Sequence, residues 1–284
     1  GIVERNVKTP RRAAVRPGTA RKIVAGTAKS IVATLCITTQ AAVLPEDRLD
    51  VLYHSFEGGG VKIDGPSVLV RKEIANTVSV HANYYVDMVS SASIDVEVSG
   101  ASRYSEERKE YTVGADYLRN RTMMSLNYSN STENDFDSDT VSFDISQDFF
   151  GDMTTLSMGV SFGEDIVRRT GDDVFEEEAE RRRYRVSLTQ VLTKNWITNI
   201  SFESVIDEGY LQNPYRFVRF LDATSSSPFS IGQENYPDTR NSDAFALRSM
   251  YYLPYRASLR AEYRSYSDNW DIRAQNYELR YIHP

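Results

Sequence analysis

Apolar and polar residues alternate most clearly between Asn76 and Met88. From Val78 onward every second residue is apolar, whereas the intervening positions, from Thr77 to Asp87, are mainly polar. Successive side chains of a strand point to opposite sides, so the pattern predicts a β-strand with one apolar and one polar face. Strands of soluble proteins usually end after about five or six residues, whereas this run matches the roughly 9–11 residues of a tilted membrane-spanning strand.

The same alternation recurs along the rest of the chain and predicts about twelve strands. The first two are less regular, and Gly65–Pro66 indicates a break or bulge in the second. The expected strands cover residues 49–56, 61–72, 76–88, 110–117, 124–129, 141–146, 155–162, 183–189, 196–206, 244–253, 259–264 and 276–281.

The connections between these strands alternate in length. Short turns are expected near residues 74, 119, 150, 194 and 254, and longer polar connections at 89–107, 130–138, 163–181, 207–242 and 266–271. A soluble sandwich would mix loop lengths at both ends, whereas an outer-membrane barrel has short turns on its periplasmic side. We therefore predict an all-β fold, an antiparallel transmembrane β-barrel. We expect an even total of about fourteen to sixteen strands, some of them beyond the C-terminus of this sequence.

Composition agrees with this class. The 284-residue chain is 26% charged and has a mean hydropathy of -0.46, which excludes a helical membrane protein. Eighteen Tyr and twelve Phe against two Trp suit strands that face lipid on one side and water on the other.

Residues 1–42 are expected to form a signal or targeting segment, and residues 43–284 the barrel domain. A basic region precedes a weak apolar stretch, Ile23–Leu35, which Lys29 interrupts. A disordered basic tail or an amphipathic helix is the alternative. Cleavage after Ala41 would remove the single Cys36 and leave 25 basic and 39 acidic residues of the 33 and 40 present. Such an acidic chain is a poor candidate for nucleic-acid binding.

Three segments of this chain resemble one family closely. Asp64–Lys72, Tyr84–Val96 and Asp207–Arg216 are similar to an uncharacterised family of proteobacterial outer-membrane β-barrels, domain of unknown function number 3570. The resemblance covers about residue 43 to the end. It implies a barrel in the outer membrane of a Gram-negative bacterium, and it implies no particular activity.

The sequence gives little sign of catalytic or metal chemistry. His54, His81 and His283 lie on separate segments without ligand spacing, and no nucleophile elbow is present. We predict no metal, no cofactor and no enzyme. A catalytic site at the barrel rim around His54 is a further hypothesis, less favoured than the channel and the scaffold described below.

Charged residues of the polar face are distributed unevenly along the chain. Acidic residues are expected on the early strands and basic residues on the later ones, so that two oppositely charged walls would face each other across a lumen. Alternatively, later charges such as Arg260 or Arg264 pair with Glu278 and fill the lumen. The predicted lumen-lining residues are Asp87, Glu110, Asp116, Asp144, Arg185, Glu203, Arg248, Arg260, Glu262, Arg264 and Arg280, and Arg183 and Glu278 share this face.

Two connections carry unusual side chains. The acidic block Asp172–Glu180 with Arg181–Arg183 could bind divalent cations or lipopolysaccharide phosphates, although a solvated extracellular loop explains it equally well. The aromatic connection 207–241 is expected to fold into the lumen as a constriction, with a binding surface as the alternative.

These patterns favour a passive channel or transporter for small polar or anionic solutes. A non-conducting scaffold or assembly component of the outer membrane is the alternative. The expected partners are the lipid bilayer, lipopolysaccharide, the outer-membrane assembly machinery and small polar solutes, and no nucleic acid.

Overall fold

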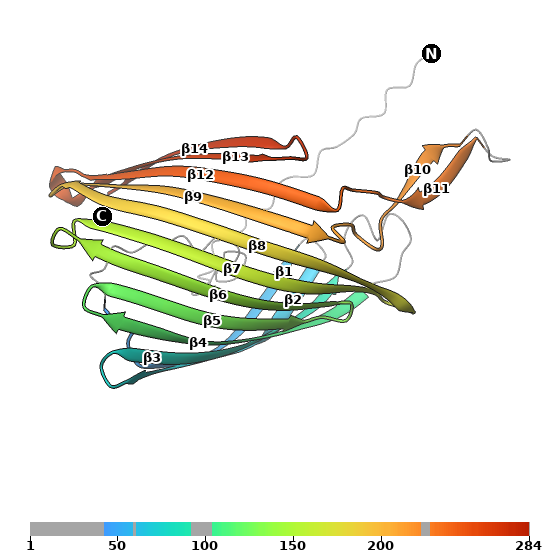
Figure 1. Ribbon diagram of the computed structural model, residues 1–284, viewed down its shortest axis with the longest axis horizontal. Helices are drawn as coiled ribbons and strands as arrows, with labels where there is room; N and C mark the ends of the chain where they lie inside the picture. The colour runs from blue at the N-terminus through green and yellow to red at the C-terminus, as the bar shows by residue number, and fades with distance from the viewer. Residues whose placement is uncertain (1–42, 59–60, 92–103, 223–227, 284) are drawn as a thin grey trace, which may run out of the picture. The chain divides into compact units, whose positions relative to one another are not determined.

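The computed structural model describes residues 43–58, 61–91, 104–222 and 228–283. The predicted leader, residues 1–42, lies outside them, as does the 92–103 part of one expected connection. Most of the described chain forms one strongly curved, twelve-stranded antiparallel sheet (Figure 1). Its strands are β1 (Arg48–Gly58), β2 (Val61–Ile74), β3 (Val78–Ser91), β4 (Tyr104–Arg119), β5 (Thr122–Thr132), β6 (Phe136–Phe149), β7 (Thr154–Arg169), β8 (Asp172–Thr193), β9 (Trp196–Gly209), β12 (Thr239–Tyr252), β13 (Ser258–Asp268) and β14 (Arg273–Ile282).

The strands pair in chain order. Each is antiparallel to the next from β1 to β9, and β9 then pairs with β12, which continues through β13 to β14. Within this sheet β1 and β14 are the edges, while β10 (Phe217–Leu221) and β11 (Phe229–Gln233) form a separate hairpin. The predicted fold class, an antiparallel β-barrel of the transmembrane type with twelve strands, is confirmed. No helix in the described ranges is long and apolar enough to cross a membrane.

The five predicted short turns all lie at one end of the sheet, but the other end has short turns as well, since two residues separate β7 from β8 and three separate β5 from β6. Two residues separate β4 from β5 and β8 from β9, and a short 3-10 turn, Pro254–Arg256, joins β12 to β13. Several turn residues adopt the left-handed backbone region that tight hairpins require, among them Asn76 and Asn120 with φ of 55° and 56°.

Burial in this sheet is inverted relative to a soluble protein. Among the described residues, eight polar or charged side chains are buried but only four apolar ones, all small or medium in size. Large apolar residues instead lie exposed on the other face: Leu126 is 54% exposed, and Tyr84, Phe143 and Leu259 are exposed as well. Val160 is only partly covered, so the described part of the chain has no dry apolar core beneath a second sheet. A surface of this kind requires an apolar solvent, which a bilayer provides.

The prediction of a long loop at residues 163–181 is wrong. β7 and β8 continue through this region as paired strands and turn at Thr170–Gly171, so the acidic block belongs to β8. Arg168 on β7 holds it in place, since its guanidinium lies 2.9 Å from Glu176 and 2.6 Å from Asp137. The pattern missed these strand ends because beyond the membrane both faces meet water and alternation is lost. For the same reason the connection expected at 130–138 shrinks to residues 133–135.

The aromatic connection does not fold into the lumen as expected. Phe217, Phe220 and Phe229 lie exposed on the β10–β11 hairpin, which projects from the end of the sheet (Figure 1). The connection is anchored on both sides of the hairpin: Tyr210 packs edge-on against Phe175 with ring centroids 5.5 Å apart, and Tyr236 stacks on Trp270 with ring centroids 5.3 Å apart.

The expected irregularity at Gly65–Pro66 is a local break and not a bulge. The β2–β3 register is the same on both sides of it, but residues 65 and 66 make no pair with β3. Pro66 has no N–H to donate, and a Cβ on Gly65 would collide with the carbonyl oxygen of Val86.

Neighbouring residues on β6 test which face meets lipid. Phe143 lies on the exposed apolar face and Ser142 on the polar face. Phe143→Arg should destabilise the folded protein in phospholipid vesicles by about 2–4 kcal/mol, the cost of an arginine near the bilayer midplane. Ser142→Arg, which faces the small side chains of Asn127 and Ser161, should cost much less. Urea titration in vesicles measures both, and equal losses would contradict the assignment of the faces.

Candidate functional site

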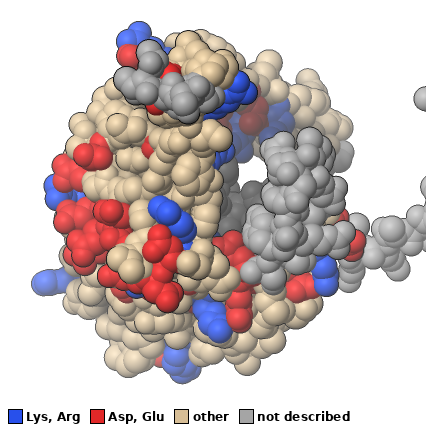
Figure 2. All heavy atoms as spheres, turned by 90° about the vertical axis from the view of Figure 1, so that its right-hand side faces the viewer, with Lys and Arg blue, Asp and Glu red and all other residues tan. Residues whose placement is uncertain are grey.

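The strand register places all the predicted lumen-lining residues on one face. Following the pairing from Asp144 leads through Gly159 and Arg185 to Glu203, and from Arg248 through Glu262 to Glu278. We refer to this side, which carries the buried polar residues, as the inner face. Figure 2 views the end of the sheet from which β10 and β11 project and shows a hollow with basic side chains inside it.

The early strands do not form the acidic wall that was expected. Arg71 on β2 forms an ion pair with Asp116, which also accepts a hydrogen bond from Ser125. Arg108 on β4 lies 2.6 Å from Glu110, and Arg185 on β8 lies 2.7 Å from Asp144. The carboxylates are thus neutralised by arginines beside them. Arg71 and Arg108 were overlooked because they come from strand ends whose alternation is weak. The prediction of an acidic wall that faces a basic wall across the lumen is therefore wrong.

His54 and Asp87 meet at the edge of this wall. His54 Nε2 lies 2.7 Å from Asp87 Oδ1, and the imidazole stacks on Tyr85 with ring centroids 4.9 Å apart. The Tyr85 hydroxyl is 3.4 Å from the same nitrogen. A carboxylate that holds a histidine is one part of a nucleophilic site, but within the described residues no serine or cysteine hydrogen-bonds to His54. The absence of an enzymatic function stays a prediction.

Three arginines converge on one glutamate in the late strands. The Glu262 carboxylate, 1% exposed, accepts hydrogen bonds from Arg248 at 2.8 Å, from Arg260 at 2.6 Å and from Arg264. The expected pairing of Arg260 or Arg264 with Glu278 is wrong, because both guanidiniums turn to Glu262 on their own strand, while Glu278 pairs with Arg280 at 3.0 Å. The cluster carries more positive than negative charge.

The arginines of the acidic block face in different directions. Arg182 points outward and is held by Glu180 at 2.7 Å and Glu208 at 3.3 Å, so its charge is already matched. Arg181 and Arg183 lie on the inner face. The three arginines therefore do not share one face, and their binding of lipopolysaccharide phosphates stays a prediction.

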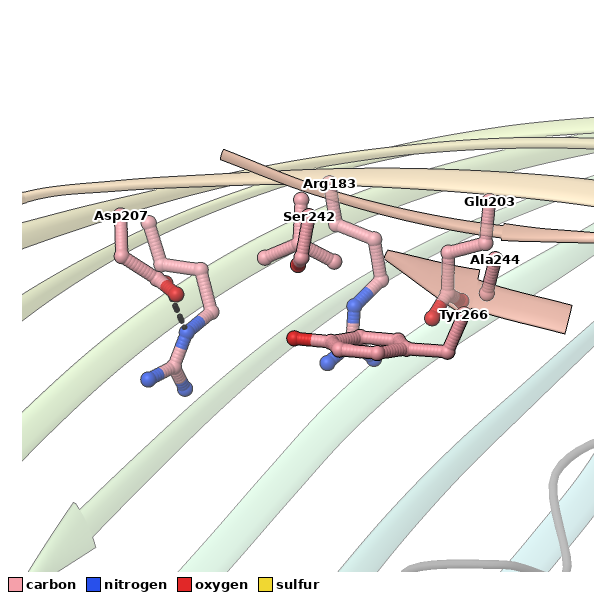
Figure 3. Close-up of a pocket in the computed structure, with 8 residues that line it drawn as sticks. Arg183, Glu203, Asp207, Ser242, Ala244 and Tyr266 are labelled. Carbon is pink, nitrogen blue, oxygen red and sulfur yellow. Dashed lines mark hydrogen bonds and ion pairs between the residues drawn. The ribbon is translucent and has the colours of Figure 1, made fainter. Parts of the chain in front are cut away.

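A cavity of about 250 Å³ lies on the inner face where β8, β9, β12 and β13 run side by side. Figure 3 shows Arg183, Glu203 and Tyr266 projecting from this wall toward the strands of the opposite side. Arg181 donates to Asp207 at 2.8 Å. Of the lining residues, Arg183 and Glu203 were predicted on the polar face, whereas Asp207 was assigned to a connection. The lining is Arg181, Arg183, Glu203, Val205, Asp207, Ser242, Ala244 and Tyr266.

Three carboxylates gather at the end of the sheet with the longer connections. Glu106, Glu133 and Asp135 each place one oxygen within 4.8 Å of the others. Burial, and then repulsion from Glu106, raise the pKa of Glu133, although Arg108 lies 3.7 Å away. The cluster could hold a cation geometrically, but exposed acidic groups often gather without one.

Comparison with known proteins identifies the family. The model of the family described as "Protein of unknown function (DUF3570)" matches residues 99–185 and 172–284. The chain belongs to this family. The resemblance inferred from the sequence is thus confirmed for this DUF3570 chain, and a comparison with curated proteins gave no match.

The DUF3570 chain is similar to solved structures. One of them is the outer membrane transporter YddB from Escherichia coli, with 12% sequence identity and a TM-score of 0.43, and the match covers 78% of this chain and 36% of that one. The DUF3570 chain therefore spans about a third of the length of the structure it matches.

The Glu262 cluster provides a stability test. Glu262→Ala leaves three arginines without their shared carboxylate and should lower the free energy of unfolding by about 3–5 kcal/mol, as expected when a buried pair loses one partner. Glu278→Ala, which removes a carboxylate 35% exposed and bound to one arginine, should cost at most about 1 kcal/mol. Urea unfolding in micelles measures both, and similar losses would contradict the assigned central role of Glu262.

Glu133 provides a test of pH dependence. Because folding raises the pKa of Glu133, folding favours its protonated form, and this contribution to stability is lost as pH rises through the folded-state pKa. Glu133→Gln should therefore be more stable than wild type at pH 8. The difference should shrink below the unfolded-state pKa of about 4.3. Urea midpoints at pH 8 and pH 4 measure this, and a variant less stable at pH 8 would refute it.

Proposed function

We propose that this chain forms an outer-membrane channel that passes small polar or anionic solutes by diffusion. The observation that carries the proposal is the inner face, where charged side chains line a hollow while the apolar side chains face away from it. A polar interior inside an apolar exterior is the arrangement of a water-filled barrel. The protein would lie in the outer membrane of a Gram-negative bacterium, with the end that carries the turns near residues 119 and 194 in the periplasm.

The preference for anions rests on the late strands. Arg264 donates to Glu262 beside Arg248 and Arg260, and the Arg264 side chain is 46% exposed to the inner face. Charges that line a narrow wet passage attract counter-ions and repel ions of their own sign. Closure of the passage requires partner strands for β1 and β14, because a barrel has no free edges.

A non-conducting scaffold is the second candidate. Ion pairs such as Arg71–Asp116 and Arg185–Asp144 reach across an intervening strand, from β2 to β4 and from β8 to β6, and would also stabilise a filled barrel. In that role the bilayer, lipopolysaccharide and the assembly machinery would be its partners. Conduction separates the two candidates.

Ion selectivity tests the channel directly. The intact protein in planar bilayers should conduct, and under a potassium chloride gradient its reversal potential should indicate preference for chloride. Arg264→Gln should shift that potential toward cation preference, because it removes an accessible positive charge from the inner face. Arg119→Gln, which removes the same charge at the exposed end of β4, is the control and should change little. Sealed bilayers would refute the channel and favour the scaffold, and equal shifts in both variants would refute the assigned role of the inner face.

A further inference from the structure

The cavity between β8 and β13 contains an arginine and a glutamate without counter-charges. Arg183 Nε is buried and has no hydrogen-bond partner, and neither Arg183 nor Glu203 forms an ion pair within the described residues. The other two charges of the lining neutralise each other, since Arg181 binds Asp207 at 2.8 Å. One positive and one negative group therefore remain available in the same cavity.

The strand register explains why these two charges are unmatched. Arg183 lies opposite Ser161 on β7 and Val205 on β9, and neither of these can neutralise it. Glu203 lies opposite Arg185 and Ala244, but the Arg185 guanidinium turns the other way and binds Asp144 at 2.7 Å. The ion pairs found elsewhere on the inner face thus do not include Arg183 and Glu203 in this cavity.

Arg183 and Glu203 are diagonal neighbours on adjacent strands, a relation that separates backbone positions by roughly 7–8 Å. Their charged ends do not meet in an ion pair, and Figure 3 shows both side chains reaching into the same space beside the Tyr266 ring. Tyr266 is a fixed wall, since its hydroxyl donates to Asp268 at 3.0 Å and accepts from Arg240 at 3.2 Å.

We propose that this cavity binds a small zwitterion, with its carboxylate on Arg183 and its ammonium group on Glu203. The inference rests on the proposed channel and names a solute class for it. The lining as a whole is electrically balanced, so a simple anion or cation would meet one repelling group, whereas a zwitterion satisfies both. A volume of about 250 Å³ is below the roughly 300–1,000 Å³ of pockets for drug-sized ligands and suits a solute the size of a small amino acid.

Two solutes of the same atomic composition test the proposal. Glycine is zwitterionic, whereas its isomer glycolamide is uncharged, so they differ in charge but hardly in size. In vesicles that contain the intact protein, glycine entry should saturate with concentration, and glycolamide entry should not. Arg183→Met and Glu203→Gln should each weaken glycine binding about tenfold, the usual effect of losing one charge-assisted contact. Arg183→Lys keeps the charge and should retain most of the binding.

Arg264→Gln is the matched control, because it removes an inner-face arginine outside the cavity lining. It should shift ion selectivity without changing glycine saturation. If glycine and glycolamide enter alike in wild type and in both cavity variants, the zwitterion site is refuted while the channel stands. If the vesicles are sealed to both, the channel is refuted. Binding of radiolabelled glycine to the protein in micelles, measured by equilibrium dialysis, then tests the site separately. The zwitterion site is refuted if glycine does not bind, or if it binds equally to wild type and Arg183→Met.

Discussion

The whole architecture depends on one constraint: a strand in hydrocarbon has to satisfy every backbone N–H and C=O through its neighbours. Twelve strands paired in chain order do this everywhere except along the outer edges of β1 and β14, and the period-two alternation then decides what each face can carry. Lipid accepts only the apolar face. The polar residues therefore gather on the other side, where they need partners of their own. Burial that is inverted relative to a soluble protein is the direct consequence.

Pairing on the inner face is local. Arginines and carboxylates lie on the same or nearby strands, as in the Arg71–Asp116 pair and the Glu262 cluster, so most charges are neutralised where they stand. The strand register explains why a few charges remain unpaired. Arg183 lies opposite Ser161 and Val205, which carry no charge. Glu203 lies opposite Arg185, but Arg185 pairs with Asp144. These unpaired charges are the ones available to bind a solute, because a charge that is already paired contributes mainly to the structure.

The sequence was sufficient for what alternation encodes. The strand from Val78 and the common face of the residues predicted to line the lumen followed from parity alone. It was insufficient where both faces meet water, and so the acidic start of β8 was mistaken for a loop. Ion-pair partners could not be predicted either, because Arg260 has Glu262 two residues away on its own strand and Glu278 diagonally opposite on the next strand. The direction of the arginine side chain decides which glutamate it binds, and the alternation of faces does not specify that direction. The cavity depends on four strands at once and left no local pattern.

The central claim is that one face of each strand contacts lipid and the other contacts water. Nitroxide labels placed singly at Val141, Ser142, Phe143 and Asp144 on β6 of the intact protein in vesicles test it most directly. Collision rates with oxygen, which concentrates in lipid, and with a water-soluble nickel chelate should alternate. The labels at Val141 and Phe143 should favour oxygen, and those at Ser142 and Asp144 the chelate. Uniform access to the chelate, or alternation of the opposite phase, would contradict the account.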